Sequence, residues 1–231
     1  MSSKRTYGEG CAVAHALDLV GERWALLAVR ELLLGPKRFT DLRAGIPNVS
    51  PNVLAERLRE LEDAGVVRRS KLPPPAAARV YELTEWGGEL EPAVLALGRW
   101  GARSPWLPQD AGMSPDAQVL ARRTVFDPDA ADGLDATYGL AIGDMLYRAR
   151  VADRAFEIER GEPADPDATI ATDQAHLAAL LWGGRDLAEA RASGEVDVGG
   201  SVALARRFLA LFPQPETAAV SRRGDPVARS S

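Results

Sequence analysis

Cys11 and His15 lie four residues apart, so on a helix their side chains would share one face. A thiolate beside an imidazole can act as a nucleophile with its base. No third group nearby would orient the imidazole, however, and the flanking residues are apolar. Asp127, Asp129 and Asp132 resemble a calcium loop only loosely, because they lack its spacing and its closing glutamate. Neither cluster predicts catalysis.

Motifs for other enzyme chemistry are missing from the sequence as well. It contains neither a phosphate-binding loop nor the glycine-rich dinucleotide fingerprint. Two histidines and one cysteine are too few for a convincing zinc site, and a single cysteine cannot form a disulfide within the chain. We therefore predict a protein that is not an enzyme and that uses no metal and no cofactor.

Residues 50–61 combine a helix start with an apolar face. Ser50 can accept a hydrogen bond from the free backbone amides of a helix start, and Pro51 suits the first helical position. Leu54, Leu58 and Leu61 follow at spacings that place them on one buried face. The pattern predicts a capped amphipathic helix.

The opposite face of that helix carries side chains that can pair with the bases of DNA. A rotation of about 100° per residue turns Asn52, Glu56 and Arg59 outward and leaves Arg57 on the flank. Asn can pair with adenine and Glu can accept from cytosine, whereas nearby cations would contact phosphates. The predicted DNA-binding residues are Lys37, Arg38, Thr40, Ser50, Pro51, Asn52, Glu56, Arg57, Arg59, Arg68, Arg69, Lys71 and Arg79. The alternative is a plain helical hairpin with a solvated, charged face.

The segments around this helix are those that would position a reading helix. Three helices, a hairpin of basic strands and a closing helix make a winged helix, which is a variant of helix-turn-helix. Hydrophobic periodicity and turn residues predict helices over 12–20, 23–34, 39–43 and 84–103, and strands over 66–72 and 79–83.

The second half of the chain differs in charge and in pattern. Residues 1–105 hold 15 Lys and Arg against 13 Asp and Glu, whereas the remainder holds 13 against 20. A mildly basic half joined to an acidic half indicates two modules with different partners. Strands with glycine turns are predicted over 136–161, a helix or strand over 116–126, a strand over 167–173, helices over 174–184, 185–192 and 201–212, and a short strand or turn over 194–200.

These patterns predict an α+β protein with two domains and no membrane span. No apolar stretch reaches the roughly 18 residues that a spanning helix needs, and the N-terminus MSSKRTYGEG lacks a signal core, so we expect a cytoplasmic protein. The predicted divisions are a winged-helix domain over 1–104, a linker over 105–115, an α+β domain over 116–213 and a disordered tail over 214–231.

From Cys11 to Trp100 the sequence resembles the HxlR-type winged-helix transcription regulators. The resemblance is carried by "CAVAHALDLVGERWALLAVRELLLGPKRFTDL", "IPNVSPNVLAERLRELEDAGVVRR", "RVYELTEWGGEL" and "LGRW". It implies a homodimer that binds a pseudo-palindromic operator in double-stranded DNA, with residues 12–20 and 88–103 at the interface. The segment from Pro73 to Ala78 departs from the family pattern, because it is stiff and uncharged, and this argues against a contact by the tip of the wing.

Some proteins of the HxlR type sense oxidants or electrophiles through a cysteine just ahead of the first helix, and Cys11 occupies that place. A helix N-terminus stabilises a thiolate, which is the reactive form. The resemblance therefore implies a redox role for Cys11. The alternative is that Cys11 is a small, partly buried apolar residue.

The second half resembles sterol-carrier-like domains, which are α+β domains around an apolar tunnel. The stretch "PDATIATDQAHLAALLWGGRDLAEARASGEVDVGGSVALARRFLALF" carries this resemblance. It implies a small apolar ligand, and the alternative is that the apolar residues simply form a core. The candidate ligand-binding residues are Leu177, Leu180, Leu181, Trp182, Phe208, Leu209 and Phe212.

Together these observations predict a homodimeric regulator that binds DNA through its first domain. A small apolar ligand in the second domain, or oxidation of Cys11, would control it. The alternative function is a lipid- or metabolite-binding interaction module whose winged helix serves only for dimerisation.

Overall fold

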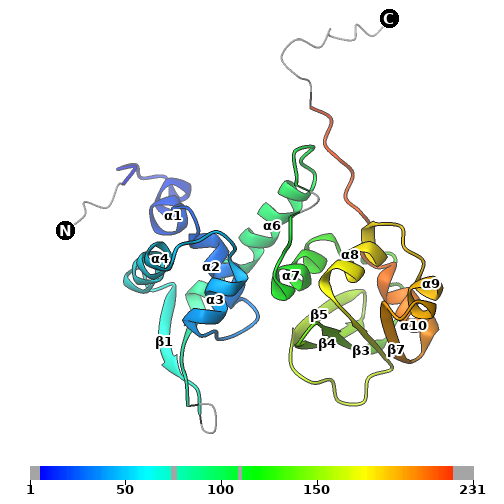
Figure 1. Ribbon diagram of the computed structural model, residues 1–231. Helices are drawn as coiled ribbons and strands as arrows, with labels where there is room; N and C mark the ends of the chain where they lie inside the picture. Colours follow the sequence, from blue (N-terminus) through cyan, green and yellow to red (C-terminus); the bar gives the residue numbers. More distant parts are fainter. Residues whose placement is uncertain (1–5, 74–76, 109–110, 221–231) are drawn as a thin grey trace, which may run out of the picture.

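The chain forms two units that each surround their own hydrophobic core (Figure 1). The computed structural model describes residues 6–73, 77–108 and 111–220. The predictions for the N-terminal residues, the tip of the wing, part of the linker and the end of the tail fall on residues 1–5, 74–76, 109–110 and 221–231, which lie outside the described residues.

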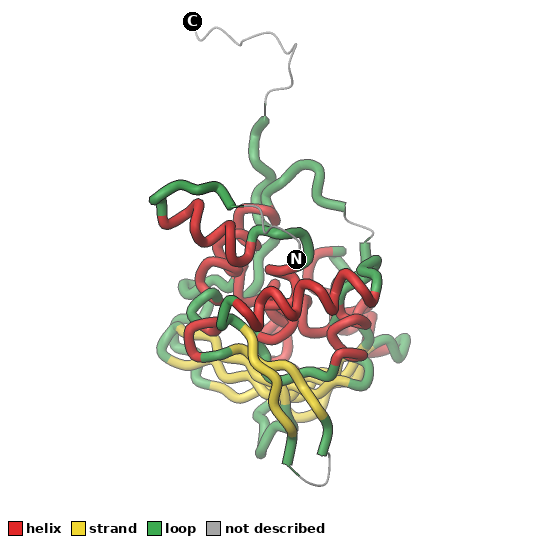
Figure 2. The backbone as a smooth tube through the Cα atoms, turned by 90° about the vertical axis from the view of Figure 1, so that its left-hand side faces the viewer, coloured by secondary structure: helices red, strands yellow, loops and turns green. Residues whose placement is uncertain are grey.

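The first unit is a winged helix, as the sequence predicts. Its core brings together the apolar faces of the first four helices and the start of the first strand. The two strands pair in an antiparallel hairpin that extends away from the helices (Figure 2). The elements are α1 (Ala12–Val20), α2 (Ala25–Leu32), α3 (Phe39–Gly45), α4 (Pro51–Asp63), β1 (Val67–Lys71), β2 (Arg79–Leu83), α5 (Glu85–Gly88) and α6 (Glu91–Ala102).

The single helix predicted over 84–103 is in fact two helices. Thr84 caps α5, because its hydroxyl accepts a hydrogen bond from the Gly87 amide at 2.9 Å. The chain breaks after α5, and Pro92 then lies in the first turn of α6, where a missing N–H costs least. Gly87 is required at this point, since a Cβ there would lie 2.0 Å from the Val66 carbonyl oxygen.

The second unit is built on a mixed sheet. Its strands are β3 (Ala136–Ile142), β4 (Met145–Ala152), β5 (Ala155–Arg160), β6 (Ala168–Thr172) and β7 (Val196–Gly200), in the order β5-β4-β3-β6-β7. All neighbouring strands are antiparallel except β3 and β6, which are parallel. Asp153 and Arg154 both have positive φ, of 50° and 60°, which suits the tight turn between β4 and β5.

Helices cover this sheet and complete its core. The segment 116–126, which the sequence left open between helix and strand, is the helix α7 (Pro115–Val125). The remaining helices are α8 (Gln174–Trp182), α9 (Leu187–Ala192) and α10 (Val202–Leu209). An aromatic cluster fills the core, with ring centroids 4.6 Å apart for Tyr138 and Phe208 and 5.1 Å apart for Phe208 and Phe212.

The two units meet where α6 packs against α7 (Figure 1). The packing is close, because a Cβ on Gly98 would lie 2.9 Å from Thr124 Cγ2. The described part of the predicted tail also returns to the first unit: Ala218 N–H donates to the Arg103 carbonyl at 2.7 Å. Within the described residues, no helix has the length and apolarity to cross a membrane.

Candidate nucleic-acid interface

Helix α4 has the two faces that its sequence predicts. Leu54, Leu58 and Leu61 are buried in the first core. Asn52 and the other two candidates for base contact, Glu56 and Arg59, are exposed to solvent. The helix is therefore anchored from behind, and its polar side chains are free to contact another molecule.

The start of α4 is fixed by its predicted cap. Ser50 Oγ accepts a hydrogen bond from the Val53 amide at 3.3 Å, and Pro51 occupies the first turn. Asn48 lies in the preceding turn with a φ of 67°, a conformation that Asn tolerates better than most residues. The turn between α3 and α4 is thus short and locally determined.

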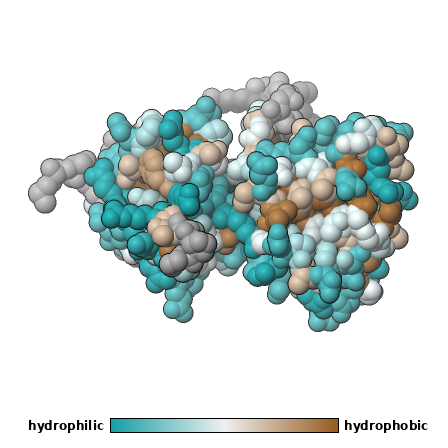
Figure 3. All heavy atoms as spheres, turned by 60° about the horizontal axis from the view of Figure 1, so that its bottom comes forward, coloured by the Kyte–Doolittle hydropathy of each residue, from teal (hydrophilic) through white to brown (hydrophobic). Residues whose placement is uncertain are grey.

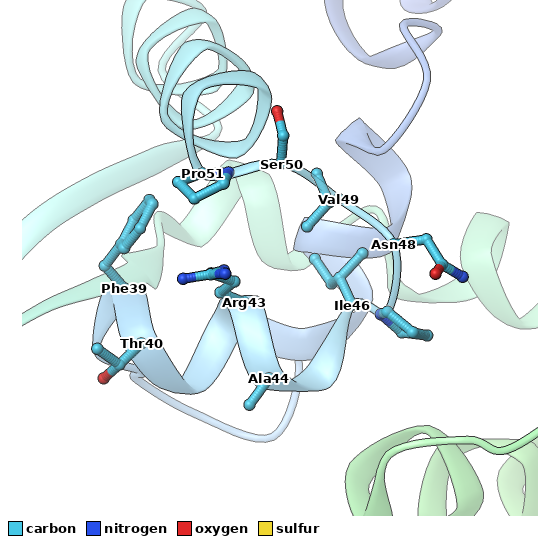
Figure 4. A pocket seen from close by; sticks show the side chains of 10 residues that line it. Phe39, Thr40, Arg43, Ala44, Ile46, Asn48, Val49, Ser50 and Pro51 are labelled. Carbon is cyan, nitrogen blue, oxygen red and sulfur yellow. The ribbon is translucent and has the colours of Figure 1, made fainter.

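A hollow of about 690 Å³ opens beside this turn, between α3 and the start of α4 (Figure 4). Thr40, Ser50 and Pro51, all predicted to contact DNA, line it. Arg43 also lines the hollow and is exposed, and its side chain extends over it in Figure 4. Arg43 is not among the predicted contacts, although its position next to the buried Leu42 on a short helix could have indicated an exposed cation.

Several predicted phosphate contacts are exposed around α4 and the wing. Arg68 and Arg69 are exposed but form ion pairs with Glu82 at 2.9 Å and Glu62 at 3.2 Å. Four other predicted contacts are exposed and form no ion pair with any residue that the structure describes, and the same holds for Arg43; the four are Arg38, Arg59, Lys71 and Arg79. They are the stronger candidates for phosphate contact, because they need not break an ion pair first.

Two predicted phosphate contacts need correction. Lys37 is buried, and its ammonium group is paired with the carboxylates of Glu31 and Asp116. Arg57 has a side chain that is 12% exposed and pairs with Glu60. Neither cation is available to a phosphate in this structure. Both cations were assigned to phosphates because they are close to α4 in the sequence, and the sequence does not reveal that carboxylates already pair with them.

Cys11 is exposed directly before α1. The backbone amides of Ala14 and Val13 at the start of the helix lower the pKa of its thiol. A lowered pKa increases the thiolate fraction near neutral pH and hence the reactivity of the sulfur. Within the described protomer the thiol is therefore on the surface, and Cys11 does not pack into the core of its own chain.

Apolar side chains remain exposed on α1 and α6. Val13 and Leu17 lie one turn apart on α1, and Leu97 and Trp100 lie on α6. Trp100 is 78% exposed, and no residue of α6 is fully buried. Exposed apolar side chains on a helix, such as these, are typical of a surface that another protein covers.

The candidate ligand-binding residues of the second unit pack into its core. Leu177, Leu180, Phe208 and Phe212 are buried there, while Leu181 and Leu209 are partly buried against it and Trp182 is also partly buried. Neither the hollow beside α4 nor a second one of about 480 Å³ on the sheet is lined by any of the seven residues. The described contacts thus favour the alternative of a core. On one face the second unit also shows a band of apolar residues (Figure 3).

Comparisons with known proteins match the two units separately. Residues 19–110 match the family of HxlR-like helix-turn-helix proteins, and residues 119–218 match the alkyl sulfatase C-terminal family. The HTH-type transcriptional regulator YvaP of Bacillus subtilis is 41% identical over 85 residues, which cover 37% of this chain and 79% of YvaP.

Two solved structures resemble parts of the chain. The redox regulator HypR in its oxidised form is 36% identical, covering 39% of this chain and 94% of HypR, with a TM-score of 0.37. The sec-alkylsulfatase Pisa1 from Pseudomonas sp. is 20% identical, covering 44% of this chain and 16% of the enzyme, with a TM-score of 0.41.

The fold and the exposed face of α4 define a winged helix-turn-helix protein. With a family match over 19–110 and a relative covered over most of its length, the chain belongs to the HxlR-like helix-turn-helix family of transcriptional regulators.

Proposed function

We propose that this chain binds double-stranded DNA as a homodimer, with α4 of each protomer in the major groove of one half of a pseudo-palindromic operator. The observation that carries the proposal is the arrangement of α4. Three leucines hold it from behind, and Asn52, Glu56 and Arg59 are exposed along its other side. A helix held in this way presents side chains to base edges without disturbing the core.

The exposed residues of α4 can contact bases, which gives specificity, or phosphates, which gives affinity. Asn52, in the first turn, can pair with adenine, and Glu56 can accept from the amino group of cytosine. Arg59 lies two turns into the helix and can contact a guanine or a phosphate. Such contacts to bases would give sequence preference.

Phosphates would bind to the cations that surround α4. Arg43 at the hollow, Arg38 before α3, and Lys71 and Arg79 at the ends of the wing strands are exposed. Lys71 and Arg79 face each other in the strand register, so they bring two positive charges to one place on the wing. Contacts of this kind supply affinity that falls with salt and carry no sequence information.

Dimerisation would bring two such units together through α1 and α6. Their exposed apolar residues, Val13 and Leu17 on α1 and Leu97 and Trp100 on α6, would be buried in the dimer. Burial of a tryptophan that is exposed in the protomer would contribute strongly to association.

The signal that controls binding would act at Cys11. The thiol is exposed, its pKa is lowered, and it precedes a helix that we place at the dimer interface. Oxidation by hydrogen peroxide would convert the two thiols of a dimer to one disulfide between the protomers, with reduction of the peroxide to two water molecules, and would thereby change how the protomers pack. Control by an apolar ligand has weaker support, because the residues assigned to it are packed against one another.

The experiment that tests this function is a titration of the full chain with duplexes from its own upstream region, read by fluorescence anisotropy across a salt series. The proposal predicts a steep loss of affinity with salt. It also predicts that Asn52→Ala weakens binding to the preferred duplex more than binding to a scrambled one. The matched control is Arg191→Ala, because Arg191 is an exposed cation on α9 in the second unit. It should change neither the affinity for the preferred duplex nor the affinity for the scrambled one.

The same titration distinguishes the proposed function from the alternative function. If the winged helix serves only for dimerisation, the chain dimerises normally, yet no upstream duplex binds in preference to a scrambled one at any salt concentration.

A further inference from the structure

A cluster of buried charges joins the two units. It consists of Glu31 on α2, Lys37 before α3, Asp116 on α7 and Arg160 at the end of β5. Glu31, Lys37 and Asp116 are all buried. Glu31 and Lys37 belong to the winged helix, whereas Asp116 and Arg160 belong to the second unit, so the charges pair across the junction.

Lys37 bridges the two carboxylates of the cluster. Its Nζ is 2.5 Å from Asp116 Oδ2 and also pairs with Glu31 Oε2. Arg160 holds the same carboxylate of Asp116 from the second unit with two nitrogens: Nε donates to Oδ1 at 3.0 Å and Nη2 pairs with Oδ2. Arg160 also reaches into the first unit, where it donates to the carbonyl oxygens of Pro36 at 3.4 Å and Glu31 at 3.5 Å.

The other oxygens of the cluster are satisfied by neutral or flanking groups. Ser114 Oγ donates to Glu31 Oε1 at 2.7 Å, and Arg30 pairs with the same oxygen at 2.8 Å. Tyr147, on β4, donates from its hydroxyl to Asp116 Oδ1 at 2.7 Å. A buried ion cluster is stable only when its lone pairs and protons are matched in this way, so its geometry is closely defined.

The cluster lies directly against the parts of the winged helix that we assign to DNA. The backbone of Lys37 pairs with that of Tyr81 on the wing. The Lys37 N–H donates to the Tyr81 carbonyl with an N to O distance of 3.0 Å, and the Tyr81 N–H donates to the Lys37 carbonyl with an N to O distance of 2.8 Å. Glu31 lies against Gly45 at the end of α3, where a Cβ would be 2.1 Å from Oε2. Gly45 is the last residue of α3 and precedes the turn to α4.

Resting on the DNA-binding function proposed above, we propose that the second unit controls operator binding through this buried charge cluster. A change in the second unit that moves α7 or the end of β5 would displace Asp116 or Arg160. Lys37 and Glu31 would then lose their partners, and the wing and the α3–α4 turn would lose the contacts that hold them. A close-packed junction of this kind changes between discrete arrangements rather than deforming gradually.

The test changes a residue of the cluster that lies in the second unit and measures the effect on the winged helix. Arg160→Gln in the full chain should raise deuterium exchange of the amides in 37–50 and 79–83 at least fivefold, and should weaken binding to an upstream duplex at least fivefold. Arg154→Gln is the control, because Arg154, in the turn between β4 and β5, is also an arginine paired with an aspartate, Asp129, but on the exposed surface. It should leave both readouts within twofold of the parent.

A milder variant guards against misfolding. Tyr147→Phe removes one hydroxyl that donates to Asp116, and it should shift both readouts in the same direction by a smaller factor. Unchanged exchange within β3 and β4 would establish that the second unit is intact in either variant. With that unit intact, unchanged exchange in 37–50 and unchanged DNA affinity in Arg160→Gln would overturn the proposal.

Failure of the two proposals is distinguishable. If the parent chain binds no duplex, the proposed function is wrong, and the exchange measurement still decides whether the second unit holds the turn and the wing.

Discussion

Lys37 Nζ lies 2.5 Å from Asp116 Oδ2, so a cation of the winged helix is neutralised by a carboxylate of the second unit. The adjacent residue, Arg38, is exposed beside α3. Two neighbouring cations therefore have different roles: Lys37 joins the units, and we assign Arg38 to phosphate contact.

Substitution separates these two roles. Lys37→Ala leaves two buried carboxylates without their shared cation, and breaking a buried pair costs about 3–5 kcal/mol, so a large fall in the free energy of unfolding is expected. Arg38→Ala should change that free energy by less than about 0.5 kcal/mol, yet it should weaken DNA binding and lower its salt dependence. Denaturant unfolding and a salt series measure the two effects. Equal loss of stability in both variants would contradict the assignment.

Acid should weaken the junction. Burial alone raises the pKa of Asp116, but the hydrogen bond from Arg160 and the charge of Lys37 outweigh it and hold the pKa below its ordinary value. A lowered folded pKa stabilises the fold above the unfolded value of about 3.9, and this contribution is lost as pH falls through the folded pKa. The denaturant midpoint of the parent chain should therefore fall more steeply below about pH 4 than that of Asp116→Asn. Parallel curves would show that Asp116 makes no such contribution.

The cap of α4 can be tested by two substitutions at one position. Ser50→Ala removes the acceptor for the Val53 amide and should lower the free energy of unfolding by about 1 kcal/mol, whereas Ser50→Gly should lower it by only a few tenths. Chemical denaturation of both variants measures the difference. No loss in Ser50→Ala would mean that the hydrogen bond does not support the start of the helix.

Association should depend on the exposed tryptophan of α6. Trp100→Ser removes the most exposed large apolar side chain of that helix, so the dimer dissociation constant should rise at least tenfold, or about 1.4 kcal/mol. Sedimentation velocity across a concentration series measures this constant. Trp86→Ser, at a 51% exposed tryptophan on α5, serves as the control. An unchanged constant in Trp100→Ser would place the interface elsewhere.

Cys11 should react as a thiolate at lower pH than an ordinary cysteine. The amides at the start of α1 lower the pKa of its thiol, so the midpoint of the alkylation rate against pH should fall below about 8.5. Iodoacetamide labelling followed by mass spectrometry gives this midpoint, and unfolded chain supplies the reference. A midpoint equal to that of the unfolded chain would remove the basis for a redox role.

The features that depend on neighbouring residues were predictable from the sequence. The Ser50 cap, the three leucines of α4 and the strands of the wing all follow from short spacings, and the structure confirms them. The burial and pairing of Lys37 were not predictable in this way, because Asp116 and Glu31 reach it only through the packing of two units.

The second unit illustrates the same difference. Apolar periodicity predicted α8, α9 and α10 but left α7 open between helix and strand, and a residue such as Phe208 can line a tunnel or fill a core with the same pattern. Its place beside Tyr138 and Phe212 is decided by how α10 lies on the sheet.

The central claim, that the exposed face of α4 reads DNA, is tested most directly by amide chemical shifts of the full chain during titration with an upstream duplex. The account predicts that the largest changes fall on Asn52, Glu56 and Arg59, with smaller ones at Arg43 and the wing, and that Leu177 in the second core stays unchanged. Saturable binding that leaves the signals of α4 unmoved would contradict it.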